Sequence, residues 1–355
     1  MDHPLVLGIE TSCDDTACAL LDGAGRVLSS VVSSQLAAHR PYGGVVPEIA
    51  SREHLANWPA VSGEALERAG VLLRDVEVVA ATRGPGLVGA LLVGLSIGKA
   101  IAFAGDRPFH AVHHLEGHLY SPFLRPPGDP TPPELPPSRF VGLVLSGGHS
   151  SLFAVEDGAV STLAETRDDA IGEVFDKVGK RLDLPYPQGP KVDELAERGT
   201  LGAQRFPVSR FGEALDFSYS GLKSQALLEI QRLERTLGPI DLGNLGTGED
   251  VPQPVLDLLA AFRESAAGQV LDRLERLHER RPFGLLAVSG GAAANRLLRR
   301  ELPAWAGRHG VDLRLVPLLY SGDNAAMIAH AALLRHRRGI ADDPFAAEAQ
   351  SRIPL

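Results

Sequence analysis

Two histidines four residues apart, His114 and His118, are the side chains of this sequence best suited to bind a metal ion. In a helix, positions i and i+4 lie on the same face, so one turn can present two imidazoles to a single ion. The metalloprotease helix His-Glu-x-x-His has its glutamate directly after the first histidine. Glu116 instead comes two residues after His114 and points to another face. The spacing predicts a metal site, with a polar helix end carrying solvated histidines as the alternative.

Asp323 is the candidate for a third ligand. It lies in the turn 321–324, after an expected strand at 313–316 and before an expected helix at 325–336. An acid in this place can also serve only as a helix N-cap. Two histidines and one aspartate suit Zn²⁺ or Fe²⁺ and leave positions open for a substrate.

Three loops of small or polar residues, 11–16, 146–149 and 289–291, each follow an expected buried strand. In such loops backbone N–H groups can approach an anion closely. The first loop also brings Glu10 and Asp14, which are candidates for positioning a reacting group or for proton transfer. Each loop alone could be a plain turn. Together they predict a nucleotide cleft between two domains.

The chain contains one structural unit twice, which predicts a duplicated domain. The unit is a buried strand, a polar loop, a strand, an Asp-Gly turn and a third strand, and its copies begin near residues 5 and 140. Eight prolines mark residues 121–138 as a linker or surface loop. We therefore expect domains at 1–138 and 139–355, the latter with a helical insertion at about 164–233, a Gly/Pro-rich loop at 238–254 and a last helix that packs back on the first domain. On this division Asp323 and the histidines come from different domains, and the ion is expected to bridge them.

Length and composition narrow the class of protein. The 355 residues suggest about two domains. A net charge of −9 means that any RNA contact needs a local basic face or a partner. Two cysteines exclude a disulfide framework and fit a reducing, cytoplasmic compartment. The start has no signal-peptide pattern. The apolar stretch 87–104 is shorter than the ~20 residues of a membrane span, so we expect a buried helix and no membrane contact.

In combination, the motifs of this chain resemble those of the TsaD family, whose members transfer a threonylcarbamoyl group to tRNA. They occur in family order from Val6 to about Leu333. The matching segments are GIETSCDDT at 8–16, GGVVPEIASR at 43–52, GPGL at 84–87, HHLEGH at 113–118, LSGGH at 145–149, FDK at 175–177, FSYSGLK at 217–223, and SGG at 289–291 with Asn295. The residues at 42–54, which include Arg52 and His54, could contact a substrate or form an ordinary surface turn.

The resemblance implies an actin-like, sugar-kinase-like (ASKHA) α/β fold of two related domains with a central cleft. It implies transfer from threonylcarbamoyl-AMP to the exocyclic amine of adenosine 37 in tRNAs that read codons beginning with A. It implies one divalent metal, Fe²⁺ or Zn²⁺, held by His114, His118 and Asp323, with Mg²⁺ accompanying a nucleotide as a further option. The residues implied to contact the adenylate are Val144, Leu145, Ser146, Gly147, Gly148, Asp176, Gly189, Asp193 and Asn295.

The implied partners are tRNA, a catalytically silent paralogue of TsaB type that pairs with the N-terminal domain, and a P-loop ATPase of TsaE type. Asp176 could instead pair with Lys177 or Lys180. Gln188 stands where the family usually has glycine, which bears on the contact of Gly189. The competing functions are a nucleotide-dependent kinase or ATPase of the same fold, a zinc metallopeptidase, which the displaced Glu116 disfavours, and a non-catalytic scaffold.

Overall fold

The protein is described by a computed structural model that covers residues 4–202, 205–243 and 251–355. Three stretches lie outside the described residues, namely 1–3, 203–204 and 244–250. They include the start of the sequence, where no signal-peptide pattern was found, and parts of the expected insertion and of the expected 238–254 loop. The chain divides into two compact units. Unit 1 consists of Met1–Pro137 with Val316–Leu355, and unit 2 of Ser138–Leu315. The expected boundary at 138 falls beside the observed one, but residues 316–355, expected in the second domain, are part of unit 1.

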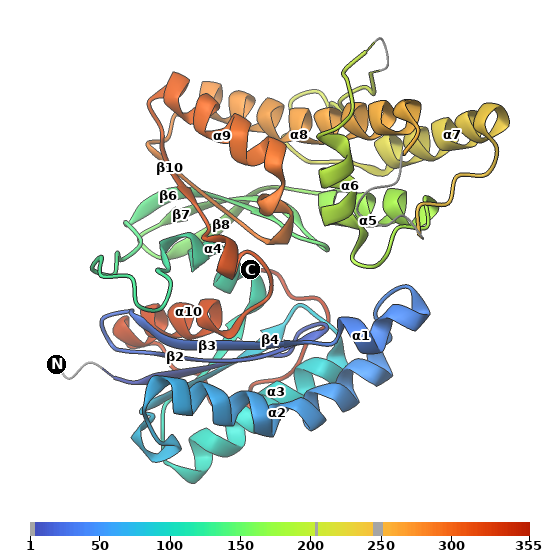
Figure 1. The fold of residues 1–355 in the computed structure, drawn as a ribbon. Coiled ribbons are helices and arrows are strands. Elements are labelled where there is room, and N and C mark those ends of the chain that lie inside the picture. The colour runs from blue at the N-terminus through green and yellow to red at the C-terminus, as the bar shows by residue number, and fades with distance from the viewer. Residues whose placement is uncertain (1–3, 203–204, 244–250) are drawn as a thin grey trace. The chain divides into compact units, whose positions relative to one another are not determined.

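Unit 1 has a five-stranded sheet among its described residues, in the order β3-β2-β1-β4-β5. β1 pairs antiparallel with β2 and parallel with β4. Helices α2 and α3 cover one face of the sheet and α10 covers the other (Figure 1). The elements are β1 (Val6–Glu10), β2 (Asp15–Leu21), β3 (Val27–Ser34), α1 (Leu36–His39), α2 (Pro47–Ala69), β4 (Val78–Gly84), α3 (Val88–Ala104), β5 (Phe109–His113), α4 (His114–Tyr120) and α10 (Ala325–Arg337), with 3-10 turns at Arg40–Tyr42, Leu73–Asp75, Ser121–Phe123 and Leu318–Tyr320.

Helix α10 packs closely on the central strand β1. A Cβ at Gly8 of β1 would lie 2.4 Å from the carbonyl oxygen of Ala325. Only glycine permits this approach, because real Cβ atoms do not come so near a carbonyl. The expectation that the last helix packs on the first half of the chain agrees with this contact.

Unit 2 repeats the same sheet topology in its described residues, in the order β8-β7-β6-β9-β10. β6 pairs antiparallel with β7 and parallel with β9, as β1 does with β2 and β4. The duplication predicted from the sequence is therefore confirmed. The elements are β6 (Arg139–Leu145), β7 (Ser150–Glu156), β8 (Ala159–Glu165), α5 (Ile171–Arg181), α6 (Gln188–Ala196), α7 (Ser220–Leu237), α8 (Gln253–Arg280), β9 (Leu285–Ser289), α9 (Arg296–His309) and β10 (Asp312–Leu315), with a 3-10 turn at Gly291–Ala294.

One helix boundary differs from the expectation. The sequence predicts a helix from 292 to 300 that contains Asn295, but a 3-10 turn ends at Ala294 and Asn295 is the N-cap of α9. Its side chain accepts a hydrogen bond from the Leu298 N–H at 3.1 Å. Asparagine is a favoured N-cap because its side-chain oxygen can accept from a free N–H group of the first turn.

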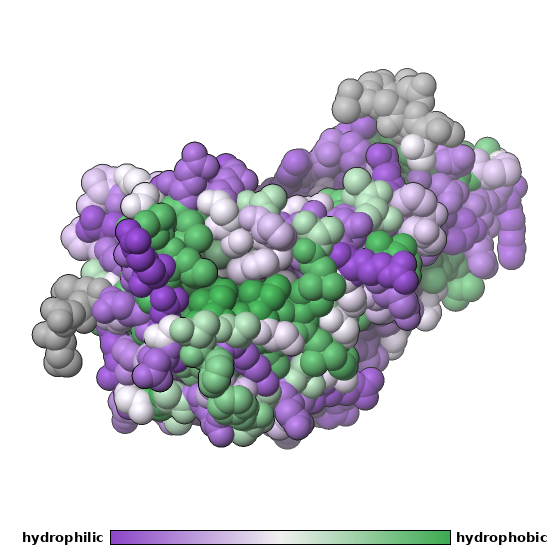
Figure 2. All heavy atoms as spheres, turned by 90° about the horizontal axis from the view of Figure 1, so that it is seen from below, coloured by the Kyte–Doolittle hydropathy of each residue, from purple (hydrophilic) through white to green (hydrophobic). Residues whose placement is uncertain are grey.

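The apolar helix α3 is buried on one side only, contrary to the expectation of a buried helix. Its side chains Val88, Leu92 and Phe103 are exposed, and so is Leu55 of the neighbouring α2. Figure 2 shows an extended hydrophobic area on this side of unit 1. Within the described ranges, none of the helices combines the length and apolar character that crossing a bilayer requires.

Candidate metal centre and substrate-binding residues

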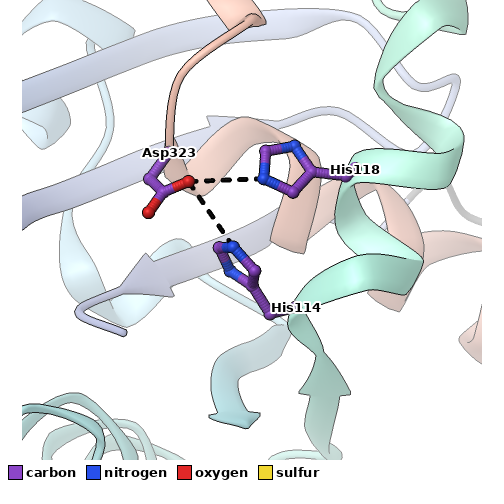
Figure 3. A group of neighbouring side chains, drawn as sticks. All are labelled: His114, His118 and Asp323. Atoms are coloured by element: carbon purple, nitrogen blue, oxygen red, sulfur yellow. Dashed lines mark ion pairs between the residues drawn. The ribbon is translucent and has the colours of Figure 1, made fainter. Parts of the chain in front are cut away.

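His114, His118 and Asp323 converge on one point in unit 1 (Figure 3). Oδ1 of Asp323 lies 3.5 Å from Nε2 of His114 and 3.3 Å from Nε2 of His118. The two imidazole rings belong to consecutive turns of α4, and their centroids are 4.7 Å apart. The geometry thus joins the histidine pair to the third candidate predicted from the sequence. Since all three residues lie in unit 1, the expectation that the ion bridges the two domains was wrong.

Asp323 is not the cap of the helix that follows it. Asn324 is the N-cap of α10, and its side chain accepts a hydrogen bond from the Met327 N–H at 3.0 Å. The carboxylate of Asp323 is therefore available to face the histidines. This excludes the alternative in which Asp323 serves only as an N-cap.

Glu10, at the end of β1, contacts His114 from the side opposite Asp323. Its Oε2 is 3.0 Å from Nδ1 of His114, and the Thr82 hydroxyl donates to the same oxygen at 2.7 Å. Its Oε1 accepts from the Ser12 N–H at 2.5 Å. Glu10 is fully buried. A carboxylate on Nδ1 fixes the tautomer that leaves Nε2 free, an arrangement typical of metal-binding histidines.

The charges of this group shift its pKa values in opposite directions. Burial alone would lower the pKa of His114, but the carboxylates of Asp323 and Glu10 outweigh it and raise that pKa to about 10. Burial lowers the pKa of His118. Burial opposes ionisation of Asp323, yet the neighbouring His114 and His118 hold its pKa well below the usual range. The raised pKa of His114 corresponds to a proton on Nε2, directed at Asp323, which a divalent cation bound there would displace.

The three residues fit a divalent metal ion. Two imidazoles and a carboxylate form a donor set for Zn²⁺ or Fe²⁺. Neither ring nitrogen of the buried His118 makes a well-aligned hydrogen bond within the described part of the chain. A buried imidazole in this state is costly unless something binds it. A cation coordinated by Nε2 would remove that cost.

His113 has a structural role. It is the N-cap of α4, where its Nδ1 accepts from the Leu115 N–H at 3.1 Å. Burial lowers the pKa of His113 to about 4, so the ring is neutral. Glu116 is held by Arg335, with Oε2 at 3.4 Å from Nη1, and does not belong to the metal-ligand group. This agrees with the sequence argument against a metallopeptidase.

Around this group, two residues have surroundings that the sequence alone did not reveal. His54, left undecided between substrate contact and surface turn, is buried and bonds the Thr16 hydroxyl at 2.8 Å and the Cys13 carbonyl at 3.1 Å, so it supports the 11–16 loop. Burial, followed by the charges of Asp323 and Asp14, raises the pKa of Asp15 to about 7. A perturbed carboxyl is a common mark of a functional site. Asp14 lies in the same half-buried loop but is not part of the metal-ligand group.

The residues expected to bind the adenylate lie in unit 2. Ser146–His149 joins β6 to β7 as a tight loop, in which the Ser146 N–H donates to the His149 carbonyl at 2.8 Å. Gly147 and Gly148 are exposed, and a Cβ at either would meet no atom within 4 Å. Val144 and Leu145 are buried at the end of β6. No side chain crowds the backbone at these two glycines, which is the property that the sequence argument requires of a loop that binds an anion.

The polar candidates of unit 2 form two bonded pairs. Asp176 of α5 accepts from the Gly189 N–H at 2.7 Å. Asp193 of α6 accepts from Nδ2 of Asn295 at 2.7 Å and from the Arg296 N–H at 3.0 Å. Gly189 is able to make its contact although Gln188 precedes it. Lys177, one suggested partner of Asp176, lies 2.7 Å from Asp169 and 2.6 Å from Glu173.

Two of the three loops expected to bind an anion pack on one another in unit 2. Gly290, at a positive φ of 91°, contacts the end of β6 so closely that a Cβ would lie 2.2 Å from the Leu145 carbonyl oxygen. No other residue fits there. The Ser289–Gly291 loop is thereby fixed beside Leu145 and Ser146, and Asn295 follows it at the start of α9.

Comparison with known families bears on the whole chain. A family model described as "TsaD: tRNA N6-adenosine threonylcarbamoyltransferase" matches residues 26–330. The chain is 47% identical to the tRNA N6-adenosine threonylcarbamoyltransferase of Pelobacter propionicus, over 92% of this chain and 90% of that protein. It is 45% identical to the protein of the same name from Syntrophobacter fumaroxidans, over 98% of this chain and 99% of that protein. Both matches extend over nearly the full length of each chain.

Solved structures of lower identity resemble the fold. The HypF structure from T. kodakarensis matches 95% of this chain and 48% of its own, with a TM-score of 0.59 and 14% identity. Component A of the (R)-2-hydroxyglutaryl-CoA dehydratase from Acidaminococcus fermentans matches 94% of this chain and 98% of its own, with a TM-score of 0.51 and 14% identity. Together with the duplicated sheets, these likenesses confirm the actin-like, sugar-kinase-like fold class.

Proposed function

Since this chain belongs to the TsaD family of tRNA N6-adenosine threonylcarbamoyltransferases, we propose that it transfers the L-threonylcarbamoyl group from threonylcarbamoyl-AMP to adenosine 37 of tRNAs that read codons beginning with A. The enzyme is an acyl-type transferase that acts on tRNA. The observation that carries the finer proposal is the convergence of His114, His118 and Asp323 in a chain that also retains the glycine loops of unit 2. We propose a cytoplasmic location, where the tRNA substrate is found.

One divalent ion, Fe²⁺ or Zn²⁺, is proposed to be held by His114, His118 and Asp323. When bound, it would supply Lewis acidity toward an oxygen of the donor substrate. Glu10 orients His114 through Nδ1, at 3.0 Å, so that Nε2 is presented to the ion. Mg²⁺ that accompanies a nucleotide is proposed as a separate role.

The adenylate is proposed to be held by unit 2. N–H groups of the Ser146–Gly148 loop would donate to the phosphate, since their glycines leave the backbone open. Asp193 and Asn295, already bonded to each other at 2.7 Å, would receive the ribose hydroxyls or an adenine edge. Asp176 and Gly189 would contact the same substrate from the side of α5.

The proposed reaction is an acyl-type substitution. The N6 amine of the tRNA adenine attacks the carbamoyl carbon, a C–N bond forms, and the bond from this carbon to the phosphate oxygen breaks to release AMP. The amine loses one proton, for which Glu10 and Asp14 were the candidates from the sequence. Glu10 already accepts from two donors and contacts His114, so its proposed role is to position that ring.

We propose that the exposed apolar side of α2 and α3 pairs with a catalytically silent paralogue of TsaB type, and that a P-loop ATPase of TsaE type joins the assembly. Leu55, Val88, Leu92 and Phe103 leave this side apolar and exposed, which is typical of a protein interface. The net charge of −9 also means that partners or a local basic face must support tRNA binding. Leu92→Glu should abolish co-purification with the paralogue, whereas Leu228→Glu, on exposed Leu228 of α7, should not.

The direct test is reconstitution with threonylcarbamoyl-AMP, tRNA and the proposed partners, followed by mass analysis of the tRNA nucleosides. We expect threonylcarbamoyladenosine from the wild-type enzyme. His114→Ala should lower the transfer rate at least about 100-fold, since even the loss of a residue that only supports a metal ligand lowers metal affinity or activity about 10–100-fold. His336→Ala, at the end of α10, is the matched control and should retain activity. If His114→Ala kept both metal and full transfer activity, the proposed metal role would be wrong.

A further inference from the structure

The segment that follows α10 is anchored to unit 1 at successive points. Asp342 pairs with β5, where its N–H donates to the Phe109 carbonyl at 3.0 Å and its Oδ2 accepts from the Ala111 N–H at 2.9 Å. Ala347 is buried in the core of unit 1, and its carbonyl accepts from Nζ of Lys99. Figure 1 draws the end of the chain beside α4. These contacts fix the direction in which the segment runs.

The segment next binds the 83–86 loop, a motif for which the proposed reaction has no use. The Gln350 N–H donates to the Arg83 carbonyl at 2.9 Å, and the Ser351 carbonyl accepts from the Gly86 N–H at 3.4 Å. A Cβ at Gly84 would lie 2.1 Å from the Gln350 carbonyl oxygen, so this position requires glycine. Both hydrogen bonds are between backbone groups, one at Gln350 and one at Ser351. Together they fix which residues of the segment lie opposite the 83–86 loop.

The register brings the Ile353 carbonyl to Nε2 of His113, at 3.1 Å. A carbonyl can only accept, so Nε2 must carry the proton and donate it. In the neutral ring Nδ1 then has a lone pair. This lone pair accepts from the Leu115 N–H at 3.1 Å and caps α4. The tautomer of His113 that can cap α4 is therefore the one that the Ile353 carbonyl selects.

We propose that the Gln350–Ile353 segment is a positioning element of the metal centre, and that it acts through the tautomer of His113. Without the Ile353 carbonyl, the proton of His113 can move to Nδ1, where it would oppose the Leu115 N–H and leave the helix uncapped. Helix α4 has only seven residues, so its first turn depends strongly on the cap. His114 is the first residue of that turn. The inference rests on the metal role proposed for His114, His118 and Asp323.

Two chain lengths that differ by one residue test this role. A chain that ends after Ile353 keeps an acceptor at this position, and a chain that ends after Arg352 lacks it. Metal-free protein of each length is titrated with Zn²⁺ against a chromophoric chelator. We expect the chain that ends at Ile353 to match the full chain, and the chain that ends at Arg352 to bind roughly 5-fold more weakly, the effect of a lost N-cap. Equal affinity of the two lengths would overturn the proposal.

His113→Asn separates this role from general support of the fold. Asparagine caps a helix without needing a partner to set its tautomer. In the His113→Asn background the two lengths should therefore bind Zn²⁺ equally, within about 2-fold by the same reasoning. If shortening weakens binding equally in both backgrounds, the segment does not act through His113. Amide exchange of the Leu115 N–H in the metal-free chains gives a second readout, and it should quicken only where the cap is lost.

The failures of the two proposals are distinguishable. If the full chain binds no Zn²⁺ or Fe²⁺, the metal role of the three ligands fails, and this positioning role fails with it. If the full chain binds metal and the length does not matter, only the positioning role fails.

Discussion

Oε2 of Glu10 lies 3.0 Å from Nδ1 of His114, although 104 residues separate them in the sequence. The carboxylate is fully buried and is held by the Thr82 hydroxyl and the Ser12 N–H. It therefore cannot leave the imidazole without losing several hydrogen bonds in an environment that excludes water. A residue first considered for proton transfer thus orients the imidazole of a proposed metal ligand.

Glu10→Gln should weaken metal binding. The amide keeps the size of the side chain but removes the charge that holds Nδ1 protonated, and loss of such a support costs about 10–100-fold in metal affinity. The measurement is a Zn²⁺ titration of the metal-free protein. Thr82→Val, which removes only one donor to Oε2, should have a smaller effect. An unchanged dissociation constant in Glu10→Gln would contradict the positioning role.

Asp193→Asn should raise the KM for threonylcarbamoyl-AMP and leave kcat nearly unchanged. Hydrogen bonds to a charged group contribute roughly 1.5–3 kcal/mol, so we expect an increase on the order of 10-fold or more. Glu197→Gln is the matched control, since Glu197 lies on the next turn and bonds Arg263, as Asp193 does. Initial rates at varied donor concentration give both constants. If both variants raise KM equally, the effect reflects α6 as a whole and not the carboxylate of Asp193.

Gly290→Ala should destabilise unit 2 far more than Gly310→Ala. Both glycines have a positive φ, 91° and 64°, so alanine is strained at either one. A Cβ at Gly290 would also lie 2.2 Å from the Leu145 carbonyl oxygen, whereas at Gly310 it meets nothing within 4 Å. We expect a further loss of about 2 kcal/mol in the free energy of unfolding at Gly290, since overpacking costs about 1–3 kcal/mol. Urea unfolding of the two variants measures this difference, and equal midpoints would argue against the close contact.

His110 should make the protein less stable in mild acid. It is fully buried on β5, and neither ring nitrogen has a hydrogen-bond partner among the described residues. Burial, then the charge of Arg335, lowers the pKa of His110 to about 4. Between pH 6.5 and 4 the unfolded chain therefore binds a proton that the folded chain does not, so stability falls as the pH falls.

His110→Leu removes this proton uptake. From pH 7.5 to pH 5 the variant should lose about 2 kcal/mol less unfolding free energy than the wild type, since each pKa unit corresponds to about 1.4 kcal/mol. Urea titrations at the two pH values provide the comparison. Val79→Ala, in the neighbouring strand β4, should cost the same at both values because its effect is a cavity. A slope that is identical in His110→Leu and the wild type would show that His110 does not titrate as described.

Local patterns were sufficient to predict the repeated strands and the histidine pair, because both depend on residues near one another in the chain. Glu10 was recognised as important but not as the partner of His114, since that contact depends on how β1 and α4 pack. Asn295 was placed inside a helix because the turn Gly291–Ala294 has a composition that continues a helix equally well. The bond from His113 to Ile353 spans 240 residues and leaves no periodic signal.

The domain assignment of Asp323 shows the same limit. Strand β10 belongs to the second sheet, and the sequence has no composition change between it and α10. The decisive contact is the packing of α10 on Gly8, which a linear pattern does not reveal. The structure brings together the three candidate ligands that chemistry and motif single out, whereas the expected division of the chain placed Asp323 in the wrong unit.

Unit 1 is built from two separated stretches of chain, with unit 2 between them in the sequence. During synthesis, unit 1 can therefore be completed only after all of unit 2 has been made. Residues 138–315 emerge before 316–355, so unit 2 has its full sequence while unit 1 still lacks α10. Until then β1 has no helix against Gly8, and the two histidines have no carboxylate opposite them. A nascent chain arrested before Asp323 would present both imidazoles but could not close the metal centre. The proposed ion could thus be bound only late in biosynthesis, after Asp323 and the start of α10 have been made.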